Sequence, residues 1–214
     1  MTFAILRSSS LALMLCAIPA IAGSQYTRMV ESKPVVTNGL EFIAAVEDEW
    51  VGYKPNYGQA SIQVQLFIHN VTDKPLLFPT FDTFGIIIKD GSGKDIGTGW
   101  GRDGTLATKS VIIDPGARYC LSRRAELKWN ADGKSRTFIY YDGTGSESTY
   151  GPLTAGRYTL SFWCESSGKS VQEELERWRR KHSEKAPLRN AHPQIANWIG
   201  KAVTKEVAFK IIDP

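Results

Sequence analysis

Three histidines are the first residues to consider for acid–base chemistry or metal binding: His69, His182 and His192. None of them has metal-ligand spacing to another. A serine or cysteine nucleophile would need one of them held beside it, and the chain contains no nucleophile-elbow motif. We therefore interpret all three as solvated side chains. The sequence predicts no catalytic residue, no metal site and no cofactor, and hence a protein that is not an enzyme.

Carboxylates form the next candidates. Three consecutive acidic residues occupy positions 47–49, and Asp142 and Glu147 share a loop that is rich in glycine and serine. Paired carboxylates hydrolyse glycosides only at defined separations, which the sequence does not fix, and ordinary loops contain such pairs too. The oxygen-bearing run 90–95 lacks the spacing and the final glutamate of a calcium-binding EF-hand loop. We expect turns in these places.

One glycine motif could bind phosphate. The run Gly99–Gly104 matches the G-x-G-x-x-G pattern of dinucleotide-binding turns. That chemistry needs a helix directly afterwards, because the helix N-terminus binds the pyrophosphate. A β-patterned run follows here, so we interpret the motif as a flexible or hairpin loop.

A helix is predicted from Val171 to His182. Ser170 and Glu173 fit a capping box, in which each side chain can bond the other residue's backbone amide. Three apolar residues recur at i, i+4 and i+7 and form one stripe: Val171, Leu175 and Trp178. The helix lies in 165–200, a long insertion before the last strand. The stripe is expected either to pack onto the rest of the domain or to expose Trp178 to a partner.

The same segment carries six basic residues with a single acidic residue, Glu184, among them: Arg177, Arg179, Arg180, Lys181, Lys185 and Arg189. An anionic partner, such as a lipid head group or a polyanion, would fit this run. The alternative is a solvated helix end whose charge matches the helix dipole. Long structured insertions are often functional, so we hypothesise a partner surface that includes Arg177, Trp178, Arg180 and Lys181.

The first 22 residues have the features of a secretory signal peptide. Arg7 gives a positive n-region, Leu11–Ile18 is apolar, and Ala20 and Ala22 supply small residues before cleavage at Gly23. The apolar stretch is too short to span about 30 Å of hydrocarbon. We expect a secreted or periplasmic protein whose domain comprises residues 23–214, without a transmembrane span after cleavage.

The net charge argues against a nucleic-acid partner, and the cysteine count predicts a disulfide. Loss of Arg7 lowers the net charge from +4 to +3, an excess too small to indicate nucleic acid. Cleavage also removes Cys16 and leaves Cys120 and Cys164. An even pair in an exported chain predicts a disulfide, with two buried thiols as the alternative.

Period-two alternation dominates the rest of the sequence. The apolar residues of 62–68 alternate with polar ones, which predicts a half-buried antiparallel strand. Further short strands are predicted at 40–46, 76–78, 84–89, 106–113, 118–127, 137–141, 155–164 and 203–212, with glycine and proline between them. This spacing predicts an all-β sandwich or barrel. Tyr158, just after Gly156, fits either a tyrosine corner or a plain core tyrosine.

Four motifs occur in a recognisable order: Asn-Val-Thr-Asp-Lys-Pro-Leu at 70–76, the run 84–94, Asp-Pro-Gly at 114–116 and Ala-Gly-Arg-Tyr-Thr-Leu at 155–160. From about Leu40 to Cys164 the chain resembles bacterial immunoglobulin-like domains of the intracellular proteinase inhibitor (BsuPI) type. The resemblance implies an immunoglobulin-like antiparallel β-sandwich, here with a helical insertion before the last strand. It also implies proteinase inhibition, although the signal peptide, the disulfide and the insertion depart from that pattern.

We therefore expect an exported, non-enzymatic binding or structural module whose partner is a protein or another envelope component. Proteinase inhibition is the alternative, and it rests on the resemblance alone. Asn70-Val71-Thr72 is also a sequon for N-glycosylation.

Overall fold

The computed structural model describes residues 28–51, 60–80, 83–102, 110–142, 146–168 and 195–213. This part of the chain contains sixteen strands and no helix, and accordingly no helix there could cross a membrane. The predicted signal peptide and the predicted helix Val171–His182 both lie outside the described residues. The prediction of an all-β fold is confirmed for the part that is described.

The larger sheet has eight strands in the order β1–β3–β5–β10–β11–β12–β8, and β2 pairs with β3 next to β1. All its pairs are antiparallel. Its strands are β1 (Met29–Glu31), β2 (Val35–Thr37), β3 (Leu40–Glu47), β5 (Ala60–Asn70), β8 (Thr98–Arg102), β10 (Arg118–Trp129), β11 (Arg136–Tyr141) and β12 (Ser146–Leu153).

The smaller sheet has five strands built around β13, which pairs with β7 along one side and with β15 and β16 along the other. β4 extends this sheet by pairing with β16 in parallel. Its strands are β4 (Glu49–Val51), β7 (Phe84–Asp90), β13 (Gly156–Ser166), β15 (Gly200–Val203) and β16 (Val207–Ile212). A third sheet joins β6 (Leu76–Pro79) to β9 (Ser110–Ile113) and, in parallel, to β14 (Ala196–Asn197).

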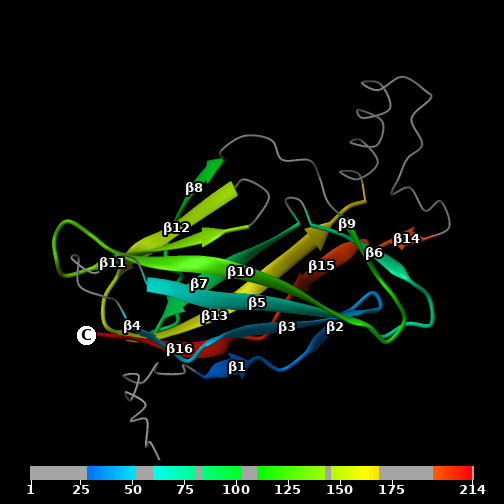
Figure 1. The fold of residues 1–214 in the computed structure, drawn as a ribbon, viewed down its shortest axis with the longest axis horizontal. Helices are drawn as coiled ribbons and strands as arrows, with labels where there is room; N and C mark the ends of the chain where they lie inside the picture. Colours follow the sequence, from blue (N-terminus) through cyan, green and yellow to red (C-terminus); the bar gives the residue numbers. More distant parts are fainter. Residues whose placement is uncertain are drawn as a thin grey trace, which may run out of the picture.

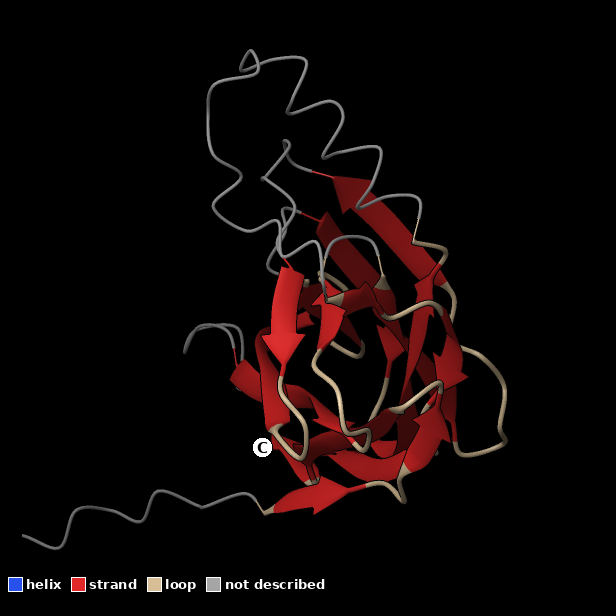
Figure 2. Ribbon diagram, turned by 90° about the vertical axis from the view of Figure 1, so that its right-hand side faces the viewer, coloured by secondary structure: helices blue, strands red, loops and turns tan. Residues whose placement is uncertain are grey.

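The two main sheets form layers around one apolar interior (Figures 1 and 2). Trp50 is 1% exposed and stacks between Phe138 of the larger sheet and Phe209 of the smaller sheet, at ring-centroid distances of 4.9 and 3.7 Å. Tyr140 of the larger sheet and Phe162 of the smaller sheet also meet across the layers, in this case edge to face. Aromatic pairs of this kind stabilise a core beyond the area that they bury.

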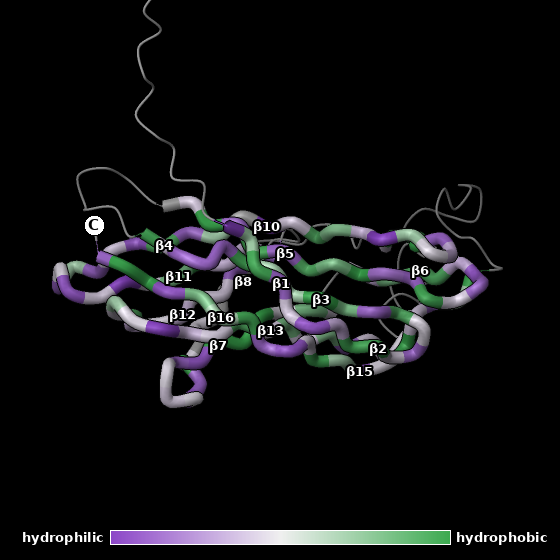
Figure 3. The backbone as a smooth tube through the Cα atoms, turned by 90° about the horizontal axis from the view of Figure 1, so that it is seen from below, coloured by the Kyte–Doolittle hydropathy of each residue, from purple (hydrophilic) through white to green (hydrophobic). Residues whose placement is uncertain are grey.

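Alternation of side chains explains why these segments are strands. Ile62, Val64, Leu66 and Ile68 of β5 are each at most 2% exposed, while their neighbours face outward. The same alternation appears along β13, where Tyr158, Leu160, Phe162 and Cys164 point inward as predicted. Figure 3 shows the two layers edge-on, with apolar and polar positions alternating along the strands.

At three places the observed elements differ from the predicted ones. The strand predicted at 203–212 is two strands, β15 and β16, because residues 204–206 interrupt it. The glycine motif is not a loop throughout, since 98–102 forms β8 and pairs with β12. The strand predicted at 106–113 is described only as β9.

Of the two alternatives for Tyr158, the structure shows the tyrosine corner. Its hydroxyl donates to the carbonyl oxygen of Thr154 at 2.9 Å and accepts from the Thr154 amide at 3.1 Å. The ring is 6% exposed. The corner ties the start of β13 to the loop before it.

Asn70 is a buried polar brace at the end of β5. Its Nδ2 donates to the carbonyl oxygens of Lys74 and Ile113, at 2.7 and 2.8 Å. Its Oδ1 accepts from the amide and the hydroxyl of Thr72, at 2.9 and 2.7 Å. The residue is 0% exposed. Because both hydrogens of the side-chain amide are engaged, a glycan on this sequon is incompatible with the folded end of β5.

The predicted disulfide is wrong: Cys120 and Cys164 are both free thiols. Cys164 points into the core from β13, whereas Cys120 lies on the outer face of β10 in the other layer. A bridge would require one strand to reverse its inward and outward faces. Burial raises the pKa of the Cys164 thiol, and partial burial raises that of Cys120, opposed by Arg118 and Arg123.

A buried arginine closes one end of the interior. Arg136 of β11 is 0% exposed, and its guanidinium lies 3.9 Å from the centroid of the Trp129 ring. It also bonds Asp213, directly after β16. This contact fastens the last described strand to the opposite layer.

Candidate binding surface at the base of the long insertion

The long insertion leaves and re-enters the domain at one place. β13 and β15 pair antiparallel with Ser166 opposite Gly200. The structure describes the chain up to Gly168, just after β13, and again from Ile195, just before β14 of the third sheet. The returning chain then reaches Gly200, beside Ser166. We call the residues that fasten these two ends the insertion base: Ser166, Gly168, Trp198, Ile199 and Gly200.

Trp198 fastens the returning end. Its side chain is 1% exposed and packs against Phe42 and Phe78, with ring centroids 5.2 and 5.5 Å away. Its indole nitrogen donates to the carbonyl oxygen of Thr37 at 3.0 Å, and its amide donates to the carbonyl oxygen of Leu77 at 2.8 Å. The chain after the insertion is therefore fixed both by apolar burial and by hydrogen bonds to two other strands.

A tight turn supports the next two residues. Asn38 and Gly39 join β2 to β3 with φ values of +47° and +83°, as in a type I′ hairpin. The Asn38 Nδ2 donates to the carbonyl oxygen of Ile199 at 2.8 Å. A Cβ on Gly200 would lie 2.8 Å from that same nitrogen, so a larger residue there would displace the Asn38 side chain from this bond.

The departing end is fixed more lightly. The Ser166 hydroxyl is buried and accepts from the Gly168 amide at 3.3 Å. Gly168 has a φ of +73°, and a Cβ there would lie 2.9 Å from Ile199. The amide of Glu165, just before, donates to the carbonyl oxygen of Thr83 at 2.7 Å. Both ends of the insertion thus contact each other through Gly168 and Ile199.

One acidic and one basic residue beside the insertion base pair with each other. The Lys201 Nζ lies 2.7 Å from the Glu165 carboxylate, and both side chains are more than half exposed. An exposed pair of this kind contributes at most about 1 kcal/mol to stability. The four residues predicted as a partner surface (Arg177, Trp178, Arg180 and Lys181) lie outside the described residues.

The residues considered for catalysis are separated in the fold. His69 is on the outer face of β5, where its Nδ1 lies 3.3 Å from Glu41. Asp48 accepts from the Arg28 amide at 3.1 Å, and Glu49 approaches Lys210 at 3.8 Å. Within the described ranges, no three His, Cys, Asp or Glu side chains come together as metal ligands would.

The run 90–95 is a hairpin turn, as predicted. The Asp90 carboxylate accepts from the amide and hydroxyl of Ser92 and from the amide of Lys94. These bonds hold the pKa of Asp90 below its ordinary value, because they favour the charged form. The Asp90 carboxylate therefore bonds groups of its own turn.

A shallow depression of about 380 Å³ lies on the outer side of the smaller sheet, at the other end from the insertion base. Its lining is of mixed charge: Asp48, Glu49, Arg157, Ala208, Phe209 and Lys210. The acidic and basic members approach each other, as Glu49 and Lys210 do, and they give the depression no dominant charge.

Comparison with known proteins identifies no family. No family model matches the chain, and no curated protein matches it. A 2.2 Å crystal structure of a conserved hypothetical protein from Bacillus anthracis is similar to part of it, with 14% sequence identity and a TM-score of 0.25. The match covers 56% of this chain and 96% of that one. A TM-score this low does not establish a shared fold.

Proposed function

We propose that this chain is an exported, non-enzymatic binding module. In this proposal the layered domain is an immunoglobulin-like β-sandwich of the BsuPI type, and the long insertion binds an anionic component of the cell envelope. The tyrosine corner at Tyr158 supports the immunoglobulin-like assignment, because such corners recur in these sandwiches.

The observation that carries the proposal is the insertion base. The 26-residue segment 169–194 follows β13 and precedes β14, and Trp198, buried directly after β14, holds its returning end in the core. Binding residues commonly lie on loops that a rigid scaffold positions. Segments of this length between strands are uncommon in compact domains and are often functional, so a role in binding accounts for this one better than a role as a simple connection.

The chemistry of the insertion indicates the class of partner. Its basic run includes Arg177, Arg180 and Lys181, which can pair with phosphate or carboxylate groups. Beside the insertion base, Glu165 and Lys201 are already paired with each other. The basic run is therefore the part of this region that attracts an anion.

The test is capture of vesicles that contain phosphatidylglycerol, compared with vesicles of phosphatidylcholine alone, together with pull-down from the envelope fraction. Replacing Arg177, Arg180 and Lys181 with glutamate is expected to abolish binding and to leave the thermal midpoint nearly unchanged. The matched control makes the same replacement with glutamate at three exposed lysines of the domain body, Lys33, Lys94 and Lys128. This variant should bind as the wild type does. Unchanged binding by the first variant would refute the proposal. Low-micromolar inhibition in a proteinase panel would favour the inhibitor alternative instead.

A further inference from the structure

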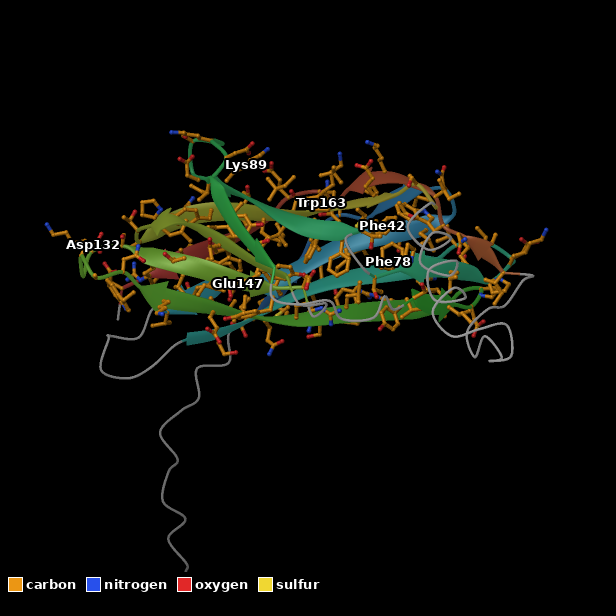
Figure 4. All side chains as sticks on the ribbon, turned by 90° about the horizontal axis from the view of Figure 1, so that it is seen from above. Phe42, Phe78, Lys89, Asp132, Glu147 and Trp163 are labelled. Atoms are coloured by element: carbon orange, nitrogen blue, oxygen red, sulfur yellow. The ribbon has the colours of Figure 1, made fainter. Side chains whose placement is uncertain are left out.

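The outer face of the smaller sheet carries an ordered apolar band. Trp163 of β13 pairs with Gly85 of β7 on one side and with Val203 of β15 on the other. A Cβ on Gly85 would lie 2.6–2.8 Å from three atoms of the indole, so the ring rests directly on the glycine. Val203 is 53% exposed, and Ile87 is half-buried one step along β7. In Figure 4, Trp163 and Lys89 lie on the outer side of this layer, while Phe42 and Phe78 lie between the layers.

Ion pairs border the band at both ends. Glu165 and Lys201 face each other across β13 and β15, with 2.7 Å between Nζ and Oε1. At the other end, the Lys89 Nζ lies 2.8 Å from Oε1 of Glu206. An aromatic centre with a charged rim is the usual composition of a protein–protein interface.

The order of these charges is self-complementary. Along β13, Glu165 marks one end of the face and Thr159, which pairs with Lys89, marks the other. A two-fold axis that lies between two such faces and crosses β13 near Phe162 would bring the Glu165 end of one copy against the Thr159 end of the other. Lys201 of one copy would then face Glu206 of the other, and Glu165 would face Lys89.

We propose that the outer face of the smaller sheet binds a second copy of this chain and forms a two-fold symmetric dimer. Such an interface uses the same patch on both copies. Trp163 and Val203 provide the buried apolar centre, and the four rim charges fix the register. The dimer does not depend on the insertion binding an anion, although it presents two insertions from one assembly.

Exposed charges contribute mainly to register and association rate, so salt should weaken the dimer without abolishing it. Sedimentation equilibrium of the purified mature chain measures this directly, from about 1 µM to about 1 mM. Reducing agent is present throughout, because the exposed Cys120 could otherwise link two copies covalently.

Val203→Glu is expected to raise the dimer dissociation constant by at least about tenfold, because it places a charge in the apolar band. Val71→Glu is the matched control: Val71 is 47% exposed on the turn after β5, away from this face, and its substitution should change nothing. A wild type that stays monomeric over the whole range would overturn the proposal, as would a Val203→Glu variant that still dimerises with wild-type affinity. If Val203→Glu lowers the thermal midpoint, Lys201→Glu, at a side chain that is 78% exposed, takes its place with the same expectations.

Discussion

Replacing Asn70 with alanine should destabilise the domain far more than an ordinary asparagine substitution. The side chain makes four hydrogen bonds, to Lys74, Ile113 and twice to Thr72, and it is fully buried. These bonds join the end of β5 to the turn that follows it and to the end of β9. The substitution therefore releases three chain segments at once.

The magnitude follows from the four bonds. Each contributes about 1 kcal/mol net, and a buried group that loses its partner costs about 1–3 kcal/mol. Water can replace the bonds of Thr72 but reaches the buried carbonyl of Ile113 poorly. We expect a loss of about 3 kcal/mol in the free energy of unfolding. For a domain of this size, that corresponds to a fall of about 6–12 °C in the thermal midpoint.

Urea titration monitored by tryptophan fluorescence measures the effect. Asn130→Ala is the matched control, because Asn130 makes two side-chain bonds within one hairpin, to Ser135 and Thr137. It should cost only about 1 kcal/mol. Asn70→Asp keeps the acceptor for Thr72 but loses both donors, and should be nearly as damaging as alanine. If Asn70→Ala costs no more than Asn130→Ala, the reasoning about the buried brace is refuted.

Three further predictions concern thiols, the tyrosine corner and acid stability. Cys120 should react with a maleimide in native buffer. Cys164 should react only after unfolding, because it is 1% exposed and burial raises the pKa of its thiol. A bridge found by non-reducing mass spectrometry would contradict the placement of the two thiols. Tyr158→Phe removes both bonds of the corner and should lower the free energy of unfolding by about 1–2 kcal/mol, whereas an unchanged urea midpoint would mean that the hydroxyl adds no stability. Hydrogen bonds lower the pKa of Asp90 and Asp132 from 3.8, so their stabilisation is complete above the unfolded-state pKa and is lost as the pH falls through the folded-state pKa. Below about pH 4 the wild type should therefore lose stability more steeply than a double Asp→Asn variant, and parallel curves would count against this assignment.

Alternation was sufficient to predict most of the long strands. The inward faces of β5 and β13 follow directly from their apolar positions. For Tyr158 the sequence left a tyrosine corner and a plain core tyrosine open, because only the bonds to Thr154 distinguish them. The short edge strands carry no such pattern. β1, β2 and β4 have three residues each and are held by their neighbours rather than by a buried face of their own.

The errors concern which way a side chain faces and which segments meet. An even cysteine count predicted a bridge, but only the pairing of β10 with β5 shows that Cys120 faces outward. Arg136 sits in an ordinary alternating strand, and nothing in its sequence indicates a buried charge beside Asp213. The sequence does hold one signal for an element outside our predictions: Asn38-Gly39 is typical of a type I′ hairpin and indicates β2. The role of Trp198 at the insertion base depends on contacts distant in sequence.

In the proposed function the domain is a scaffold and the insertion carries the binding residues. The most direct measurement replaces residues 170–193 with a flexible glycine–serine linker of about six residues and compares vesicle capture and thermal midpoint with the wild type. Gly168 lies beside Ile199, and residues 195–198 remain to extend from there to the linker, so a short linker can join the two ends while Trp198 stays in the core. We expect a midpoint close to that of the wild type and loss of capture. A folded variant that still captures anionic vesicles with wild-type affinity would contradict it.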